Sequence, residues 1–212
     1  NVSRKCFPME NNAEIEKIHT DSTALYVDKT YERLENYAKT NQIDLDEKTC
    51  YNGKNLPSLR EIAKECIEAT LALPVVPAIT HGDLCFSNIM YDARSNNIKV
   101  IDPRGLNVNQ ELTIYGNQTY DLAKLCHSII GLYDFIIADS FEFEVSEELG
   151  VNLTFNIDDR LQEIQQLFMR KQLLPSVSNN DIIAPTILLF LSMIPLHFDK
   201  PHRQKAMLAN AL

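Results

Sequence analysis

Residues 81–90, with the sequence HGDLCFSNIM, constrain this chain most, because they set polar side chains between two apolar segments. The β-rich run IKVI (98–101) follows the turn-forming sequence DARSNN, so we predict a β-hairpin that begins at the end of the motif. Asp102 comes directly after the second strand of this hairpin. The predicted hairpin therefore brings Asp83, Asn88 and Asp102 together at the mouth of a small sheet.

Two carboxylates and one amide carbonyl in one place form a set of oxygen groups that suits phosphoryl transfer. This reaction needs a carboxylate that orients the attacking hydroxyl and accepts its proton, together with oxygen ligands for Mg²⁺. Magnesium commonly takes one or two carboxylates and completes its shell with phosphate oxygens and water. The motif therefore predicts Asp83 as the proton acceptor, and Asn88 and Asp102 as protein ligands of Mg²⁺.

Outside this motif, apolar residues recur mostly at helical spacing, and the predicted fold class is α+β, mostly α, in a single domain over residues 1–212. The predicted helices cover 27–38, 59–71 with Pro57 near the first turn, 119–133 with Thr119 as N-cap, 158–174, a segment after the N-cap Asp181, and about 200–212. The runs FEFEV and VNLTF predict a second hairpin around Gly150, which either borders the acceptor site or decorates an edge of the fold. The residues before His81 show helical patterns and predict no β-meander.

The composition argues against several classes of protein. The formal net charge of −9 does not suit binding to the phosphate backbone of nucleic acid, which needs clustered Lys and Arg. The apolar stretch 182–198 is 17 residues long and contains two prolines, so it predicts a buried core helix and no membrane span. Five scattered cysteines without a CxxC pair favour a reducing, cytoplasmic location over a disulfide framework or a zinc site.

The motif also carries a resemblance to a known family. HGDLCFSN (81–88) followed by VID (100–102) resembles the catalytic loop and metal-binding aspartate of the aminoglycoside phosphotransferase and choline kinase family, relatives of the protein kinases. The segment GNQTYDLAKL (116–125) is similar to the Asp-Leu-Ala signature that opens a helix in this family, and IEKIHTD (15–21) resembles the start of its helical lobe. The resemblance covers nearly the whole chain and implies the C-terminal helical lobe of a protein-kinase-like fold, with small β-hairpins that carry the catalytic loop.

The resemblance implies specific roles for the residues of the motif. Asp83 is expected to be the catalytic base within the catalytic loop 81–88. Asn88 and Asp102, in the hairpin region 88–105, are expected to bind Mg²⁺ and with it the co-substrate ATP. The implied function is ATP- and Mg²⁺-dependent transfer of a phosphoryl group to the alcohol group of a small molecule.

Neighbouring residues have supporting roles in this interpretation. Asp121 and His81 are expected to brace the catalytic loop, and Cys85 is expected to be a packing residue. Arg104 stands where members of the family carry an acidic residue, which argues against a second metal ion. It is interpreted either as a phosphate contact or as a solvated loop residue.

The smaller lobe of the family, which covers ATP with a glycine-rich loop and a strand lysine, has no counterpart in this sequence. Gly53 is the only glycine before Gly82, and no lysine before His81 can be assigned as the ATP-binding lysine. We expect the nucleotide-binding lobe to lie outside these 212 residues, and the chain alone to be inactive. A non-catalytic pseudokinase or regulatory module of the same fold is the alternative.

The sequence leaves the acceptor open, since choline, ethanolamine, aminoglycosides and sugars all serve relatives. HGDLCFSNIMYD together with IKVIDPRG looks most like phosphotransferases of bacterial surface-polysaccharide loci, such as those for capsular polysaccharide, which suggests a sugar or sugar-linked alcohol. A cationic acceptor would need an aromatic cage, for which the candidates are Tyr115, Tyr120, Tyr133 and Phe135.

Overall fold

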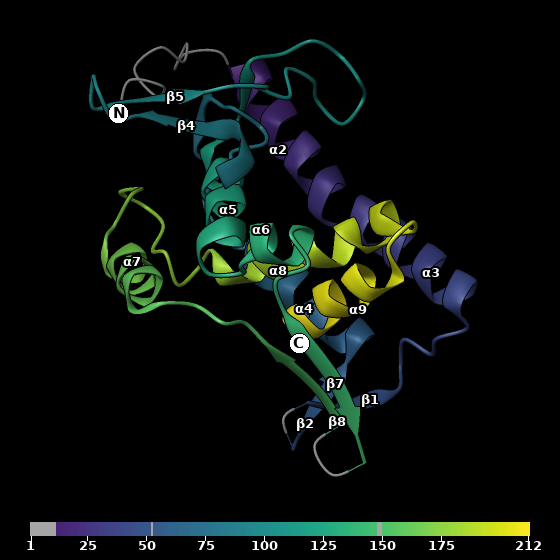
Figure 1. The fold of residues 1–212 in the computed structure, drawn as a ribbon. Coiled ribbons are helices and arrows are strands. Elements are labelled where there is room, and N and C mark those ends of the chain that lie inside the picture. The colour runs from purple at the N-terminus through teal and green to yellow at the C-terminus, as the bar shows by residue number, and fades with distance from the viewer. Residues whose placement is uncertain (1–11, 52, 148–149) are drawn as a thin grey trace.

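A computed structural model describes residues 12–51, 53–147 and 150–212 (Figure 1). The chain is about 51% helical and 19% strand, so it is an α+β protein in which helices dominate, as predicted. The helices occupy the centre of the molecule. A four-stranded sheet lies at one end and a separate two-stranded hairpin lies at the other (Figure 1).

Helix α8 (Ile183–Met193) is the centre of the core. It packs against α3 (Asp28–Asn41), α4 (Leu59–Leu71) and α5 (Gln118–Ile129). Because other helices surround it, α8 is apolar on nearly every side, and Phe190 is almost fully buried. The predicted core helix in the stretch 182–198 is therefore confirmed, with a short 3₁₀ helix, η2 (Ile194–His197), at its end. None of the helices within the described ranges is long and apolar enough to cross a membrane.

Within the described ranges, four further helices surround this core: α2 (Asn12–Tyr26), α6 (Tyr133–Ile137), α7 (Asp159–Arg170) and α9 (Pro201–Asn210). The helices predicted over 27–38, 59–71 and from about 200 are confirmed by α3, α4 and α9. Asp158 is the N-cap of α7 and accepts a hydrogen bond from the Leu161 N–H at 2.8 Å, which fixes the start of that helix.

Two helices end earlier than predicted. Helix α7 ends at Arg170, four residues before the predicted end, because the side-chain amide of Asn179 donates to the carbonyls of Phe168 and Lys171 and satisfies the last turn. Helix α5 ends at Ile129, and Leu132 with a φ of 51° separates it from α6.

Two predicted N-caps are wrong, because other hydrogen bonds take precedence. Asn117, one residue before α5, is its N-cap and accepts a hydrogen bond from the Thr119 N–H at 3.2 Å. Asp181 does not cap α8, because its carboxylate accepts from the backbone N–H and the hydroxyl of Ser178, at 3.0 and 2.7 Å.

The four-stranded sheet has the order β2-β1-β8-β7. Its strands are β1 (Lys48–Tyr51), β2 (Lys54–Ser58), β7 (Glu142–Ser146) and β8 (Gly150–Thr154). β1 and β8 run parallel, with Tyr51 opposite Val151, and the other pairs are antiparallel. The hairpin around Gly150 is confirmed. The residues before His81 are predicted to be helical without a β-meander, and the structure adds the β1–β2 hairpin to those helices. Pro57, predicted near the first turn of the helix over 59–71, lies in the edge strand β2, where its missing N–H breaks no ladder.

Two smaller pairs of strands lie on either side of the loop in residues 81–90, the HGD motif. β3 (Pro77–Ile79) pairs with β6 (Tyr115–Asn117) on one side, and β4 (Ile89–Asp92) pairs with β5 (Asn97–Val100) on the other. The predicted hairpin over 88–101 is thus confirmed, with Ile89 opposite Val100. A single 3₁₀ turn, η1 (Phe86–Asn88), leads from the loop into β4. Since β6 continues directly into α5, the motif lies against the first turn of that helix.

Candidate active site

The loop that carries Asp83 is held by the first turn of α5. The two carboxylate oxygens of Asp121 each accept a backbone hydrogen bond, from His81 N–H and from Gly82 N–H, both at 2.7 Å. Burial raises the pKa of the Asp121 carboxyl, while the two N–H donors act in the opposite direction. Asp121 therefore fixes the backbone of residues 81 and 82 before the chain reaches Asp83.

The His81 ring links the two ends of this site. Its Nε2 lies 2.8 Å from the carbonyl oxygen of Ile101, and its Nδ1 accepts the Asp83 N–H at 3.3 Å. With Nδ1 as the acceptor, Nε2 carries the proton and donates to Ile101. The ring thus joins the start of the loop to the residue that precedes Asp102.

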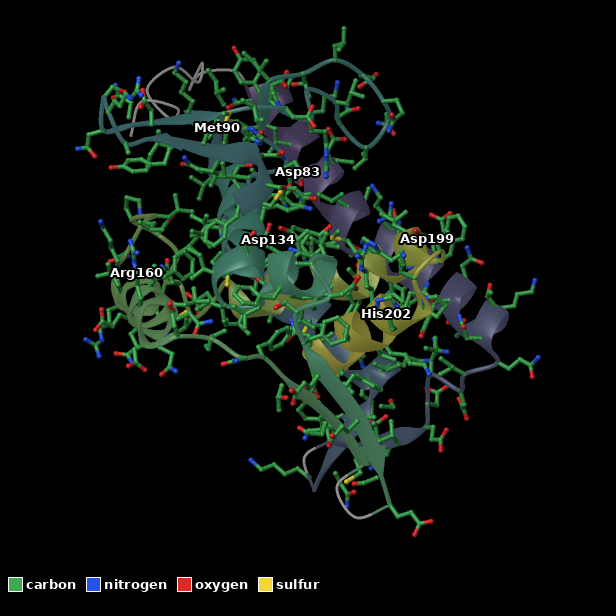
Figure 2. The ribbon with its side chains drawn as sticks, viewed as in Figure 1. Asp83, Met90, Asp134, Arg160, Asp199 and His202 are labelled. Carbon is green, nitrogen blue, oxygen red and sulfur yellow. The ribbon has the colours of Figure 1, made fainter. Side chains whose placement is uncertain are left out.

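Asp83 lies between the β4–β5 hairpin, which carries Met90, and helix α6, which carries Asp134 (Figure 2). Its Oδ1 is 2.9 Å from Nζ of Lys124, a side chain that is only 8% exposed, whereas the Asp83 side chain is 37% exposed. The amide nitrogen of Asn88 donates to the Asp83 carbonyl at 2.9 Å and lies 3.3 Å from Oδ2. The carboxylate is therefore oriented from both sides and remains open to a ligand.

Asn88 and Asp102 present oxygen atoms to the same space. The amide nitrogen of Asn88 is hydrogen-bonded to Asp83. Among the described residues, no group donates a hydrogen bond to Asn88 Oδ1 or to the Asp102 carboxylate. Asp102 has a φ of 56°, in the left-handed region that non-glycine residues seldom adopt and that is common at functional sites. One carboxylate and one amide oxygen are hard ligands that fit Mg²⁺, provided that phosphate oxygens and water complete the shell.

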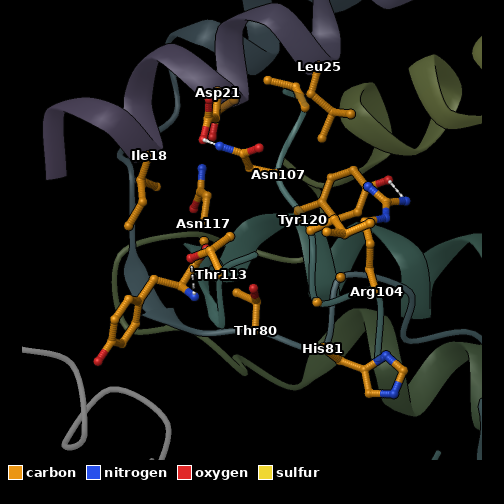
Figure 3. A pocket seen from close by; sticks show the side chains of 17 residues that line it. Ile18, Asp21, Leu25, Thr80, His81, Arg104, Asn107, Thr113, Asn117 and Tyr120 are labelled. Atoms are coloured by element: carbon orange, nitrogen blue, oxygen red, sulfur yellow. Dashed lines mark hydrogen bonds between the residues drawn. The ribbon is translucent and has the colours of Figure 1, made fainter. Parts of the chain in front are cut away.

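A cavity of about 320 Å³ opens beside these residues, and Lys29, Arg33, Asp83, Asn88, Asp102, Arg104, Tyr120 and Lys124 are among its lining. Arg104 donates through Nη2 to the Tyr120 hydroxyl at 3.0 Å, and its guanidinium lies 5.2 Å from the centre of that ring. Figure 3 shows this pair from a smaller neighbouring pocket, where Asn107 also bonds to Asp21 of α2 at 3.2 Å. The loop after Asp102 is thus fastened to α2.

The structure brings some expected residues together and separates others. Tyr120 and Tyr133 line the cavity, but Tyr115 is not among its lining residues and Phe135 packs edge-on against Phe155. The four rings therefore form no aromatic cage. The hairpin around Gly150 lies at the opposite end of the molecule from β4 and β5, so it does not border this cavity (Figure 1).

Of the cysteines in the described part of the chain, Cys85 lines this cavity. Cys85 is buried, and its Sγ lies 3.2 Å from the Ser87 hydroxyl. In the described part of the chain, Cys66, Cys85 and Cys126 form no disulfide, and Cys6 lies outside the described residues.

Three cationic residues of the cavity, Lys29, Arg33 and Lys124, are not predicted from the sequence. Lys124 follows Asp121 by three positions, a spacing that places both on one face of α5 and could have drawn attention to it. Lys29 and Arg33 are four positions apart on α3, but nothing in the sequence relates this helix to the HGD motif.

Comparison with models of protein families, with curated proteins and with solved structures finds no match to this chain. The chemistry of the site therefore has to be inferred from its own residues. These are an oriented carboxylate, a pair of metal-compatible oxygens and a group of cations around one cavity.

Proposed function

We propose that this chain is the helical, acceptor-binding lobe of an ATP- and Mg²⁺-dependent phosphotransferase of the kinase-like class, acting on an alcohol group. The observation that carries the proposal is that Asp83, Asn88 and Asp102 line one cavity. Asp121 and His81, which bind the loop backbone on either side of Gly82, support it.

In this proposal Asp83 is the general base. It accepts the proton of the acceptor hydroxyl as that oxygen bonds to the γ-phosphorus of ATP, and the bond from this phosphorus to the bridging oxygen breaks to release ADP. Lys124 and Asn88 hold the carboxylate in place, so that little reorganisation is needed during the reaction. A Mg²⁺ ion held by Asn88 and Asp102 would stabilise negative charge on the phosphate oxygens.

Turnover and nucleotide binding by the complete gene product test the proposal separately. Asp83→Asn should lower turnover at least ~10²-fold with the fold intact, because general-base catalysis contributes about that much. Asp102→Ala should abolish Mg²⁺-dependent nucleotide binding. Asp92→Asn is the matched control, since this exposed carboxylate lies on the same hairpin and only caps its turn. Retained turnover in Asp83→Asn, or unchanged Mg²⁺-dependent binding in Asp102→Ala, would contradict the assignments.

One observation favours a second candidate, a non-catalytic module of the same fold. Lys124 already occupies one oxygen of Asp83 at 2.9 Å, an arrangement that also suits a purely structural ion pair. In that case Asp83→Asn would lower stability, and the complete gene product would bind no nucleotide in the presence of Mg²⁺. Calorimetric titration with a non-hydrolysable ATP analogue and Mg²⁺ separates the two functions.

A further inference from the structure

The cavity beside Asp83 is positively charged in a chain whose formal net charge is −9. Its lining contains four cationic side chains against two carboxylates: Lys29, Arg33, Arg104 and Lys124 against Asp83 and Asp102. Only Lys124 has a carboxylate partner within 4.0 Å among the described residues. A bound Mg²⁺ would add further positive charge, so the cavity is suited to an anion.

Two of these cations come from α3 and cost free energy to bury. Lys29 and Arg33 are separated by one helical turn, and Arg33 donates through Nη1 to the Ser192 carbonyl of α8 at 2.7 Å. Burial, together with the nearby charges of Arg33, Arg104 and Lys124, lowers the pKa of Lys29 to about 8. Uncompensated cations in a partly buried site are unfavourable without a counter-charge, which a bound anion would supply.

The hydroxyl of Tyr26 is an independent sign of a missing ligand. Tyr26 lines the same cavity and is only 3% exposed, yet its hydroxyl has no hydrogen-bond partner among the described residues. A buried hydroxyl without a partner costs free energy, so such groups are rarely left unmatched. Burial also raises the pKa of Tyr26 well above its ordinary value, so the group stays protonated and can donate.

We propose that the acceptor is an anionic alcohol, with a phosphate or carboxylate group held by Lys29, Arg33 and the Tyr26 hydroxyl and its free hydroxyl directed to Asp83. The proposal rests on the proposed phosphotransferase function and names the class of its acceptor. A volume of about 320 Å³ lies at the lower end of the range for small-molecule sites, which suits a phosphorylated polyol or a small acidic sugar.

The same residues disfavour a cationic acceptor. Four cations would repel an amine or a quaternary ammonium group, and the face of Tyr120 is already covered by the guanidinium of Arg104. The triphosphate of ATP is the other possible anion. However, Tyr26, Lys29 and Arg33 come from α2 and α3, whereas the proposed metal ligands belong to the hairpin region. Because the two sets of residues lie on different elements of the fold, we assign the acceptor, and not the triphosphate, to Tyr26, Lys29 and Arg33.

Isothermal titration of the complete gene product tests the proposal with inorganic phosphate, glycerol 3-phosphate, glycerol and a non-hydrolysable ATP analogue with Mg²⁺. We expect phosphate and glycerol 3-phosphate to bind and glycerol to bind at least tenfold more weakly. Lys29→Met, Arg33→Met and Tyr26→Phe should each weaken glycerol 3-phosphate binding at least tenfold. Lys39→Met, an exposed cation on the same helix, is the matched control and should bind like the wild type. Tyr26→Phe should also unfold at the same or a higher temperature, which separates lost binding from lost folding.

Several results would overturn the proposal. These are equal binding of glycerol, no binding of either phosphate compound, and glycerol 3-phosphate affinity that does not depend on Lys29. If Lys29→Met weakens only the ATP analogue, the cations belong to the nucleotide site and the acceptor assignment is wrong. If glycerol 3-phosphate binding depends on Lys29 while Asp102→Ala leaves Mg²⁺-dependent nucleotide binding unchanged, the proposed function fails and the anion site stands.

Discussion

Gly82 and Gly105 allow a paired experiment on the geometry of the catalytic loop. Both have positive φ, 77° and 64°. An added Cβ at Gly82 would lie 2.9 Å from the Arg104 Cβ, whereas at Gly105 the nearest atom would be the Pro103 carbonyl oxygen at 3.9 Å. The two alanine variants therefore share the cost of a left-handed backbone, and only Gly82→Ala also displaces Arg104.

The expected magnitudes follow from these contacts. A left-handed backbone costs alanine about 1–2 kcal/mol, of which about 0.4–1 kcal/mol is offset by the reduced freedom of the unfolded chain. Gly105→Ala should thus lose about 1 kcal/mol, and Tm should fall by about 2–4 °C for a chain of this size. Overpacking adds about 1–3 kcal/mol to Gly82→Ala, which gives a total of about 3 kcal/mol and a fall in Tm of about 6–12 °C.

Thermal and urea unfolding followed by circular dichroism measure both variants, and phosphate titration reports on the cavity that Arg104 lines. Gly82→Ala should weaken phosphate binding more than Gly105→Ala, because the shift of Arg104 also disturbs its contact with Tyr120. Equal stabilities of the two variants would refute the proposed packing of Arg104 against Gly82. Equal phosphate affinities would refute the prediction that Arg104, as a lining residue of the cavity, contributes to anion binding.

Three more predictions concern buried groups. Lys124→Met should lower turnover of the complete gene product at least ~10-fold by freeing Asp83. It should change Tm by only about 2 °C, because the Asp83 side chain is 37% exposed and water can solvate its charge once Lys124 is replaced. Unchanged turnover would count against this prediction. His127→Phe should raise the free energy of unfolding by about 1 kcal/mol, because both ring nitrogens are buried without a hydrogen-bond partner among the described residues. Burial also lowers the pKa of His127 well below its ordinary value. A lower free energy of unfolding in urea denaturation would contradict this prediction. Phosphate affinity should fall as pH rises through about 8, where Lys29 loses its proton, and Lys29→Met should remove that step. Between about pH 8 and 10 Lys29 still binds its proton in the unfolded chain but not in the folded one, so the stability of the wild type should rise over this range.

The sequence was informative about this site where the relevant residues are close in the chain. Asp83, Asn88 and Asp102 lie within about 20 residues, and a short hairpin is enough to bring them together. Lys29 and Arg33 reach the same cavity only because α3 packs against α8, a long-range contact that no local pattern encodes.

In the fold, too, elements marked by local sequence patterns could be predicted, and an element that depends on a long-range contact could not. The apolar core helix and the hairpins at 88–101 and around Gly150 could be predicted, because continuous burial and turn residues mark them directly. The β1–β2 hairpin is not predicted, although the sequence between the two strands contains the favourable dipeptide Asn-Gly, because the strands are short, largely polar and partly exposed. These strands form because β8 pairs with β1, and this partner is about 100 residues away.

The central position of α8 has a consequence for synthesis of the protein on the ribosome. α3, α4 and α5 all leave the ribosome before α8, and until it follows, their apolar faces lack the helix that covers them in the native core. The hydrogen bond between Arg33 and Ser192 spans 159 residues, so the wall of the cavity that contains Arg33 closes only after Ser192 has been synthesised. A nascent chain that stalls before α8 would carry the whole HGD motif without a core to support it, and it would depend on chaperones during that interval.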